Sequence, residues 1–164
     1  MKSLTRDELD RLYDAAERES HLDALMFRVM FNHGLRVSEV IALTPANIMS
    51  GHLQVQRLKR SRKTTQPLLD DEKELLTMSG RFFPMSRMTA WRRMQHYGEK
   101  AGIPEFKRHP HCLKHTTGRL AYLGGLGIPE IQKYLGHVNG GNTMVYMEAD
   151  EETACSAFAA AVGK

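Results

Sequence analysis

The chain has 164 residues, the size of a single domain with one hydrophobic core. Hydrophobic residues make up 41% and charged residues 26% of the sequence, values that are ordinary for a soluble globular protein. The sequence has no apolar run of ~20 residues and no secretory signal, which argues against a membrane-spanning or exported chain. Cys112 and Cys155 are therefore expected to be free thiols in a reducing cytoplasm.

The formal net charge of +4 and the isoelectric point near 9.2 favour a polyanionic partner such as nucleic acid. The positive charge is concentrated in two segments. One comprises Arg57, Lys59, Arg60, Arg62 and Lys63, and the other Lys107, Arg108, His109, His111, Lys114 and His115. Either segment could be a solvated surface loop, but both adjoin residues that are typical of catalysis.

The N-terminal half predicts three helices. Thr5 and Glu8 form the pattern of a capping box, and apolar residues follow at helical spacing, which predicts a helix over 6–18. A more apolar helix over 21–33 ends at Gly34, because glycine tolerates the positive φ of a helix C-terminus. A short helix is expected over 37–43, before Pro45.

The only clear β pattern follows these helices. Residues 52–57 alternate as a half-buried strand does, and residues 64–69 can return beside them through a turn at 60–63. Ser86 can cap a helix over 87–101, which carries Met88, Trp91, Met94 and Ala101. Further helices are expected over 112–124, 128–135 and 150–161. The predicted fold is one domain over 1–164, mainly α with a small antiparallel β-sheet.

Four short motifs carry the chemistry of the chain. They are Gly34-Leu35-Arg36-Val37-Ser38-Glu39, His111-x-x-Lys114-His115, Leu135-Gly136-His137 and Thr143-x-x-Tyr146. Together they supply donors for a phosphodiester and a nucleophilic hydroxyl, and they contain no carboxylate cluster that would bind a metal. In this order and at these intervals, the motifs resemble the catalytic domain of tyrosine recombinases, the phage integrase family. The resemblance covers nearly the whole chain and implies that family's fold.

The resemblance implies that Arg36 binds a non-bridging oxygen of the scissile phosphate, for which a guanidinium fork is well suited. Glu39 lies three residues on, one helical turn away, and would orient Arg36. The alternative is that Arg36 is a surface arginine that simply pairs with Glu39.

Lys59 resembles the lysine that the family carries on its β-hairpin. It would donate a proton to the leaving 5′-oxygen, which is a poor leaving group as an alkoxide. Alternatively, Lys59 only contacts a phosphate, as its cationic neighbours could. The residues expected to bind DNA are Arg57, Arg60, Arg62, Lys63, Lys107 and Arg108.

His111 and His137 are expected to donate hydrogen bonds to the phosphate or to shuttle protons. His115 either faces the core or supports the site. The resemblance implies that Tyr146 attacks the phosphate, forms a 3′-phosphotyrosyl bond and releases a 5′-hydroxyl. Since the bond energy is retained, strands could be rejoined without ATP, metal or another cofactor.

The chain departs from the family pattern at Lys114, where most members have an arginine. Lysine keeps the positive charge but lacks the planar fork of arginine. We expect Lys114 still to bind the phosphate.

A second departure is length, since family members usually have an N-terminal domain that grips the other face of the duplex. The chain looks like an isolated catalytic domain, which predicts weak and salt-sensitive DNA binding. An apolar stripe within 150–162 either packs on its own domain or docks on a neighbouring protomer.

The predicted function is site-specific recombination or integration of double-stranded DNA for a phage or mobile element. The resemblance implies a tetramer on DNA, possible accessory DNA-bending proteins and a bacterial cytoplasmic, nucleoid-associated location. Three other functions compete with this interpretation. They are a type IB topoisomerase, a non-catalytic DNA-binding module, and a zinc site formed by His109, His111, Cys112 and His115, for which a second ligand pair is missing from the sequence.

Overall fold

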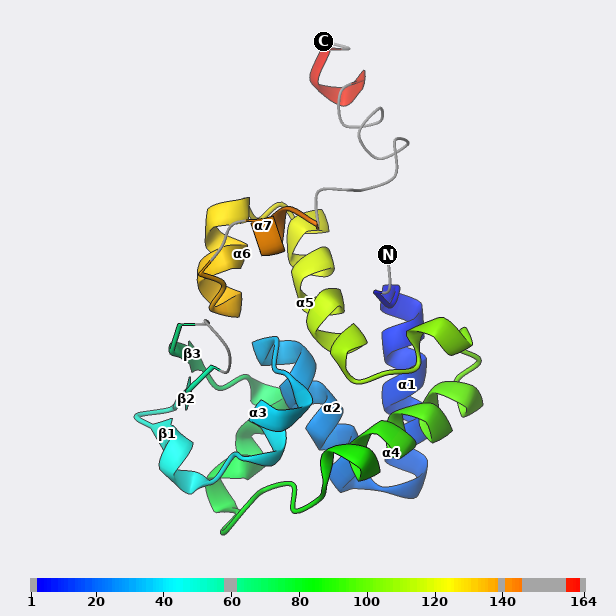
Figure 1. Cartoon of the computed structure of the whole chain (residues 1–164), viewed down its shortest axis with the longest axis vertical. Coiled ribbons are helices and arrows are strands. Elements are labelled where there is room, and N and C mark those ends of the chain that lie inside the picture. Colours follow the sequence, from blue (N-terminus) through cyan, green and yellow to red (C-terminus); the bar gives the residue numbers. More distant parts are fainter. Residues whose placement is uncertain (1–2, 58–61, 139–140, 146–158, 163–164) are drawn as a thin grey trace.

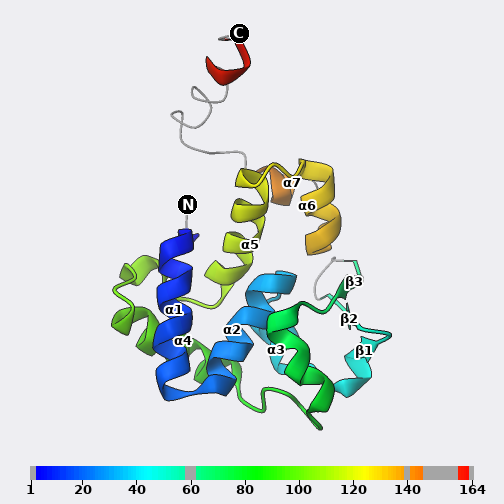
Figure 2. The same cartoon turned by 180° about the vertical axis from the view of Figure 1, so that it is seen from behind.

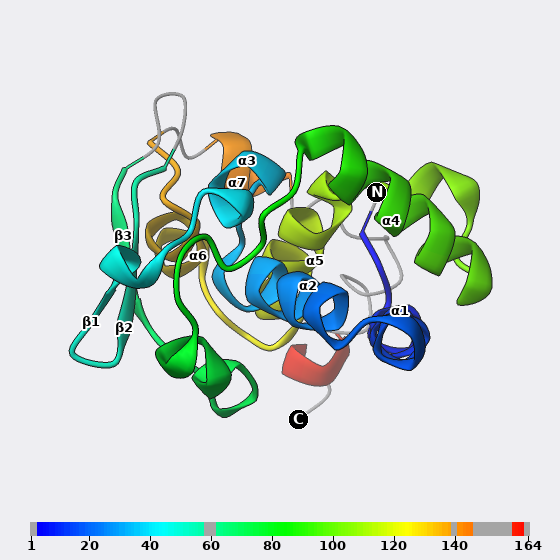
Figure 3. The same ribbon diagram turned by 90° about the horizontal axis from the view of Figure 1, so that it is seen from below.

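A computed structural model of the chain describes residues 3–57, 62–138, 141–145 and 159–162. Helices pack around the central helix α2, and a three-stranded antiparallel sheet lies at one edge of the domain (Figures 1 and 3). The helices are α1 (Arg6–Glu19), α2 (His21–His33), α3 (Val37–Ile41), α4 (Arg87–Lys100), α5 (His111–Leu123), α6 (Ile128–Leu135) and α7 (Gly141–Met144). Short 3-10 helices are η1 (Pro45–Asn47), η2 (Asp70–Thr77) and η3 (Glu105–Lys107). The prediction of a mainly α fold with a small antiparallel sheet is confirmed.

Helices α1 and α2 begin and end as the sequence predicts. The Glu8 amide donates to Thr5 Oγ1 at 3.1 Å, and the Thr5 amide donates to Glu8 Oε2 at 2.8 Å, which completes the capping box. Helix α2 is buried along most of its length because it contacts α1, α5, α3 and η2. Figure 2 shows the opposite side of the domain, with α5 leading from the core toward α6 and α7.

The sheet consists of β1 (Ile48–Met49), β2 (His52–Val55) and β3 (Thr64–Pro67), in that order. Leu53 lies opposite Gln66 and Val55 opposite Thr64, so one face of the hairpin is buried. The predicted strands over 52–57 and 64–69 are therefore present but shorter. Strand β1 has only two residues, too few for a periodic pattern to reveal.

Other differences from the prediction concern surface residues and short elements. Met88 and Trp91 are 57% and 46% exposed, although they share an apolar pattern with the buried Met94. Helices α7 and η2 were not predicted. Most of the predicted helix over 150–161 lies outside the described residues. Residues 159–162 are described, and they are helical. None of the described helices is long and apolar enough to cross a membrane.

Gly34 closes α2 in the left-handed conformation, with φ at +59°. Its missing side chain also matters for packing, because a Cβ atom would overlap Leu135 Cδ2 and lie 3.6 Å from Thr117 Cγ2. Glycine at this position therefore allows α6 and α5 to approach the end of α2 closely.

Replacing Gly34 by alanine is expected to destabilise the fold by about 2–4 kcal/mol. The left-handed backbone alone costs alanine about 1–2 kcal/mol, and displacement of Leu135 adds to this cost. Gly51→Ala is the matched control, since Gly51 has φ at +73° but no atom within 4 Å of the position that a Cβ would take. Urea denaturation should show the smaller loss for Gly51→Ala; equal losses would contradict the packing argument.

Candidate active site

A cleft of about 360 Å³ brings together five of the residues that the sequence analysis singled out. It is lined by Arg36, His111, Lys114, His115, His137, Gly141 and Val145. These residues come from the start of α3, the first turns of α5, the turn after α6, and the α7 segment. Val145 directly precedes Tyr146, which lies outside the described residues, as do Lys59 and Arg60.

Arg36 stands at the N-terminal end of α3, where Glu39 holds it in place. The Arg36 amide donates to Glu39 Oε2 at 2.8 Å, and Nη1 donates to Glu39 Oε1 at 3.2 Å. The Glu39 side chain is fully buried, whereas that of Arg36 is 27% exposed. The buried carboxylate therefore orients the Arg36 guanidinium from the protein interior, and part of the guanidinium remains exposed to the cleft.

Helix α5 places three cationic or titratable side chains on one face. The rings of His111 and His115, one turn apart, meet edge to face with centroids 4.5 Å apart. Lys114 is only 2% exposed, and its Nζ donates to the Gly34 carbonyl at 3.1 Å and lies 3.5 Å from the Leu135 carbonyl. His115, which could have faced the core or the site, lines the cleft.

Burial and repulsion between neighbouring positive charges lower the pKa values of Lys114, His111 and His137. Burial, then the charge of Arg57, lower the pKa of Lys114 to about 7. Desolvation lowers the pKa of His111 to about 4, and His115, Lys114 and Arg36 contribute in the same direction. The pKa of His137 also falls to about 4, through burial first and through Lys114 and Arg36 next. An anion placed in the cleft would relieve this repulsion.

His137 is 7% exposed and is held by the fully buried Thr143 of α7. Its Nδ1 lies 2.8 Å from Thr143 Oγ1. A threonine hydroxyl that donates to Nδ1 leaves the ring proton on Nε2. The same bond fixes α7 relative to His137, and Tyr146 follows Thr143 by three residues.

Gly136, at the end of α6, lets the β-hairpin approach His137. It is left-handed, with φ at +72°, and a Cβ atom there would lie 2.7 Å from the Arg62 carbonyl oxygen. The Arg62 amide donates to the Gly136 carbonyl at 2.8 Å. The glycine of the Leu-Gly-His motif is therefore required for packing, because it lets Arg62 of the hairpin bond next to His137.

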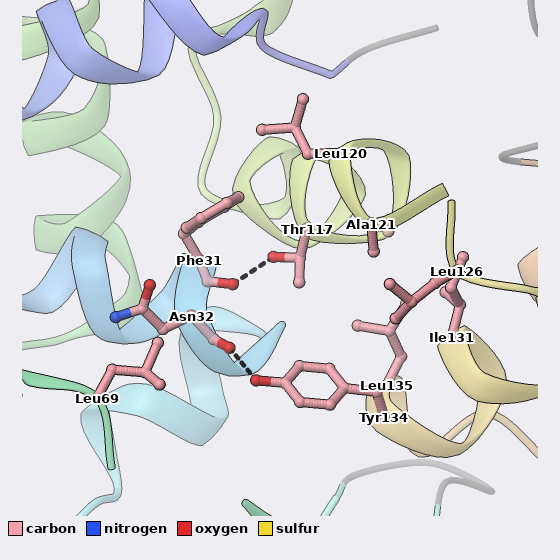
Figure 4. A pocket seen from close by; sticks show the side chains of 11 residues that line it. Phe31, Asn32, Leu69, Thr117, Leu120, Ala121, Leu126, Ile131, Tyr134 and Leu135 are labelled. Atoms are coloured by element: carbon pink, nitrogen blue, oxygen red, sulfur yellow. Dashed lines mark hydrogen bonds between the residues drawn. The ribbon is translucent and has the colours of Figure 1, made fainter. Parts of the chain in front are cut away.

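The C-terminal end of α2 lies behind the cleft. Figure 4 shows two of its carbonyls bonded by side chains from other helices, the Phe31 carbonyl by Thr117 and the Asn32 carbonyl by Tyr134. These side chains border an apolar cavity of about 320 Å³ between α2, α5 and α6. The end of α2 is thus hydrogen-bonded to α5, which carries cleft residues, and to α6, which directly precedes His137.

The structure does not bring all predicted DNA contacts to this region. Arg57 was predicted to contact DNA, but its side chain is fully buried and bonded within the protein, so this prediction is wrong. Lys107 pairs with Glu8 at 2.8 Å, and Arg108 Nε donates to the Ile103 carbonyl at 2.6 Å. Neither of these two lines the cleft.

Arg62 and Lys63 are exposed on the hairpin. A second hollow of about 600 Å³, which shares His111 with the cleft, is lined by Val37, Arg87, Met88, Trp91, His109 and Pro110. The sequence analysis did not assign a role to Arg87, Trp91 or Thr143. Trp91 gives no local signal of its exposure, since it lies between Ala90 and Met94, which are both buried. Thr143 could be found only as part of its motif.

Within the part of the chain that the structure describes, no three His, Cys, Asp or Glu residues are grouped as metal ligands. Cys112 belongs to the hydrophobic core, whereas His111 and His115 face the cleft. Cys112 therefore does not join these histidines in the arrangement that a zinc site requires.

Lys114→Met is expected to stabilise the protein in a pH-dependent way. The folded-state pKa of about 7 lies below the ordinary 10.5, so the unfolded chain binds more protons between these values. The cost of burying the charge is therefore complete below pH 7 and vanishes as the pH approaches 10.5. Methionine should raise the free energy of unfolding on the order of 2–4 kcal/mol at acidic pH and little at alkaline pH.

Denaturation across this pH range measures the effect. Lys133→Met, which removes an exposed lysine from α6, is the control and should change the free energy of unfolding little at any pH. A Lys114→Met variant that is less stable than the wild type at acidic pH would contradict the prediction.

Comparison with known proteins agrees with this geometry. The model of the phage integrase family matches residues 2–153. Tyrosine recombinase XerA of Pyrococcus furiosus is 31% identical over 164 aligned positions, which cover 88% of this chain and 56% of that protein. The chain thus spans little more than half the length of this relative.

Solved structures share the fold. The crystal structure of XerA recombinase superposes with a TM-score of 0.80 at 22% identity and covers 98% of this chain and 63% of that one. The catalytic domain of bacteriophage HP1 integrase gives a TM-score of 0.70 at 23% identity, with coverage of 94% and 93%. The chain therefore belongs to the phage integrase family and has the fold of a tyrosine recombinase catalytic domain.

Proposed function

We propose that this chain is the catalytic domain of a site-specific DNA recombinase or integrase that cleaves and rejoins strands through a 3′-phosphotyrosyl intermediate. The observation that carries the proposal is the cleft, which gathers Arg36, Lys114, His111 and His137 from three separate segments. Val145 lines the same cleft and is followed by Tyr146.

The scissile phosphate would occupy this cleft. Arg36 and Lys114 supply positive charge, and the imidazoles of His111 and His137 supply hydrogen-bond donors. The lowered pKa values of Lys114, His111 and His137 support this role, because a phosphate oxyanion restores the favourable environment that these groups lack. Lys114 thus supplies the positive charge of the usual arginine but not its planar, two-pronged hydrogen bonding.

In the reaction, the Tyr146 oxygen attacks phosphorus and loses its proton to a base in the cleft. The bond between phosphorus and the 5′-oxygen breaks, and the leaving oxygen takes a proton from a general acid. Three rival tyrosines are bonded or buried elsewhere. Tyr97 donates to Asp23 at 2.7 Å, Tyr134 donates to the Asn32 carbonyl, and the Tyr13 hydroxyl is buried.

Lys59 is the proposed general acid. It lies within 58–61, outside the described residues, but Arg62 at the end of that segment is bonded to Gly136, the residue before His137. This contact brings the described end of the hairpin next to His137, which supports a cation of the hairpin as the acid over Lys107 or Arg108, neither of which lines the cleft.

The proposed DNA surface extends from the cleft in two directions. Arg62 and Lys63 are exposed on the hairpin, and Arg60 lies in the same loop sequence. On the other side, Arg87 and the half-exposed Trp91 lie in the hollow next to His111, where a cation and an aromatic ring can meet the duplex.

Several finer assignments stay predictions of the family resemblance. They are a phage or mobile-element origin, a tetramer on DNA in which 150–162 docks on a neighbour, accessory DNA-bending proteins and a bacterial cytoplasmic location. The proposed reaction uses neither metal nor ATP, because the phosphotyrosyl link retains the energy of the broken bond.

Covalent trapping tests the reaction class. The chain is incubated at low salt with nicked duplexes that carry a randomised core, and SDS-resistant protein–DNA adducts are recovered and sequenced. Wild-type protein should form an adduct and Tyr146→Phe should form none. Tyr122→Phe is the matched control and should form the adduct at the wild-type rate.

An adduct that persists in Tyr146→Phe would refute the proposed nucleophile. Adducts without sequence enrichment, together with relaxation of supercoiled DNA, would favour a topoisomerase. DNA binding without any adduct would favour a non-catalytic DNA-binding module.

Thr143→Val is expected to slow adduct formation by about 10- to 100-fold, since His137 loses the bond that holds its tautomer and orientation. Thr143→Ser retains the hydroxyl and should remain close to the wild-type rate. Gel-shift affinity for the same duplex should change little in either variant. Equal rates for valine and serine would show that the hydroxyl has no part in the reaction.

A further inference from the structure

The guanidinium of Arg57 donates hydrogen bonds through all three of its nitrogens close to the cleft, although Arg57 does not line the cleft. All of its side chain is buried, and each of its nitrogens has a partner in the protein. Nε donates to Thr64 Oγ1 at 2.9 Å, Nη1 to the Gly34 carbonyl at 2.9 Å and to Glu39 Oε2 at 3.2 Å, and Nη2 to the His33 carbonyl at 2.7 Å and to the Tyr134 carbonyl at 3.5 Å. These acceptors belong to four different segments of the chain.

The first connection leads to Arg36. Glu39 Oε2 accepts both from Arg57 and from the Arg36 amide, while Glu39 Oε1 accepts from the Arg36 guanidinium. Since the Glu39 carboxylate is fully buried, it needs cationic partners to remain ionised there. Arg57 fixes this carboxylate from the interior, and the carboxylate fixes Arg36 at the cleft.

The second connection leads to Lys114. Its Nζ and Arg57 Nη1 donate to the same carbonyl, that of Gly34. Arg57 occupies the His33 carbonyl as well, whereas Lys114 Nζ reaches the carbonyls of Gly34 and Leu135. Without Arg57, the free carbonyls at the end of α2 would attract the Lys114 ammonium away from the cleft.

The third connection leads to the end of α6. Arg57 Nη2 reaches the Tyr134 carbonyl, and the Arg57 stem packs against Gly136, where a Cβ would lie 3.0 Å from Arg57 Cγ. The next residue after Gly136 is His137. Arg57 also bounds the segment 58–61 at the end opposite to Arg62.

We propose that Arg57 is a positioning residue for strand cleavage, whose buried guanidinium holds Arg36, Lys114 and the His137 turn in one arrangement around the phosphate. This proposal rests on the proposed function. It predicts that Arg57 affects the rate of the chemical step, whereas an arginine that contacts DNA would affect the DNA affinity. Lysine could not replace it fully, because an ammonium has three donors where the guanidinium has five in a fixed plane.

The test compares Arg57→Met and Arg57→Lys with Arg93→Met. Arg93 pairs with the buried Asp23 in the first turn of α2, whereas Arg57 binds the last turn, so loss of Arg93 is a control for general destabilisation. On a duplex that the wild type cleaves, Arg57→Met should lower the adduct rate at saturating DNA by about 100-fold, the effect of a displaced catalytic group. Its DNA affinity should stay within about 3-fold. Arg57→Lys should be intermediate, and Arg93→Met should cleave at the wild-type rate per folded molecule.

A second readout does not depend on cleavage. Arg57 is one of the charges that lower the pKa of Lys114 and of His137. NMR titration should therefore show both groups titrating at higher pH in Arg57→Met and near the wild-type pH in Arg57→Lys. If Arg57→Met does not fold, the lysine variant still separates the effect of charge from that of geometry, since only its cleavage rate should fall.

The outcomes separate the two proposals. A wild-type adduct with an unchanged rate in Arg57→Met and Arg57→Lys would overturn the positioning role and leave the proposed function intact. A loss of affinity without a loss of saturated rate would also overturn the positioning role, because it would assign the effect of Arg57 to DNA binding and not to the chemical step. If the wild type forms no adduct, the proposed function fails, and unchanged titration of Lys114 and His137 in Arg57→Met would overturn the positioning role as well.

Discussion

The last turn of α2 ends inside the protein, so its carbonyl oxygens need donors that other segments bring to it. Thr117 of α5 bonds the Phe31 carbonyl, Tyr134 of α6 the Asn32 carbonyl, and Arg57 the carbonyls of His33 and Gly34. Lys114 shares the Gly34 carbonyl. The negative end of the helix favours the two cations among these donors. The hydrogen bonds to the C-terminal carbonyls of α2 thus bring α5, α6 and the hairpin into contact with one helix end. These elements carry or flank the cleft residues.

The same arrangement makes the cleft electrostatically unfavourable when it is empty. Arg36, Arg57 and Lys114 lie close together, with Glu39 as a buried counter-charge. Burial and repulsion lower the pKa values of Lys114, His111 and His137. The fold therefore loses stability through Lys114 at neutral pH, and through the two histidines only below about pH 6.5. A site that is arranged in advance for an anion can use that lost stability in binding and in the transition state.

Sequence reasoning located most helices and most cleft residues but misjudged particular side chains. The capping box at Thr5 and the glycine at Gly34 are local signals, and the helices that they delimit are present as predicted. Arg57 was grouped with its cationic neighbours, because a run of charges does not reveal which member turns inward. Met88 and Trp91 continue an apolar pattern but are exposed, since α4 packs on α1 and α3 through other positions. Strand β1 and η2 are too short or too irregular to produce a periodicity.

By itself, the sequence determined the order of the motifs, the residue types of the site and the helices that present them, because caps and 3.6-residue periodicity act over a few positions. The family followed from those motifs. Only the tertiary structure decided that Arg57 is buried, that Thr143 holds His137, and that Gly136 leaves room for the hairpin. The Arg57 and Gly136 contacts join segments far apart in the chain, and the bond between Thr143 and His137 depends on the packing of α7 against α6. Such contacts leave no local pattern in a single sequence.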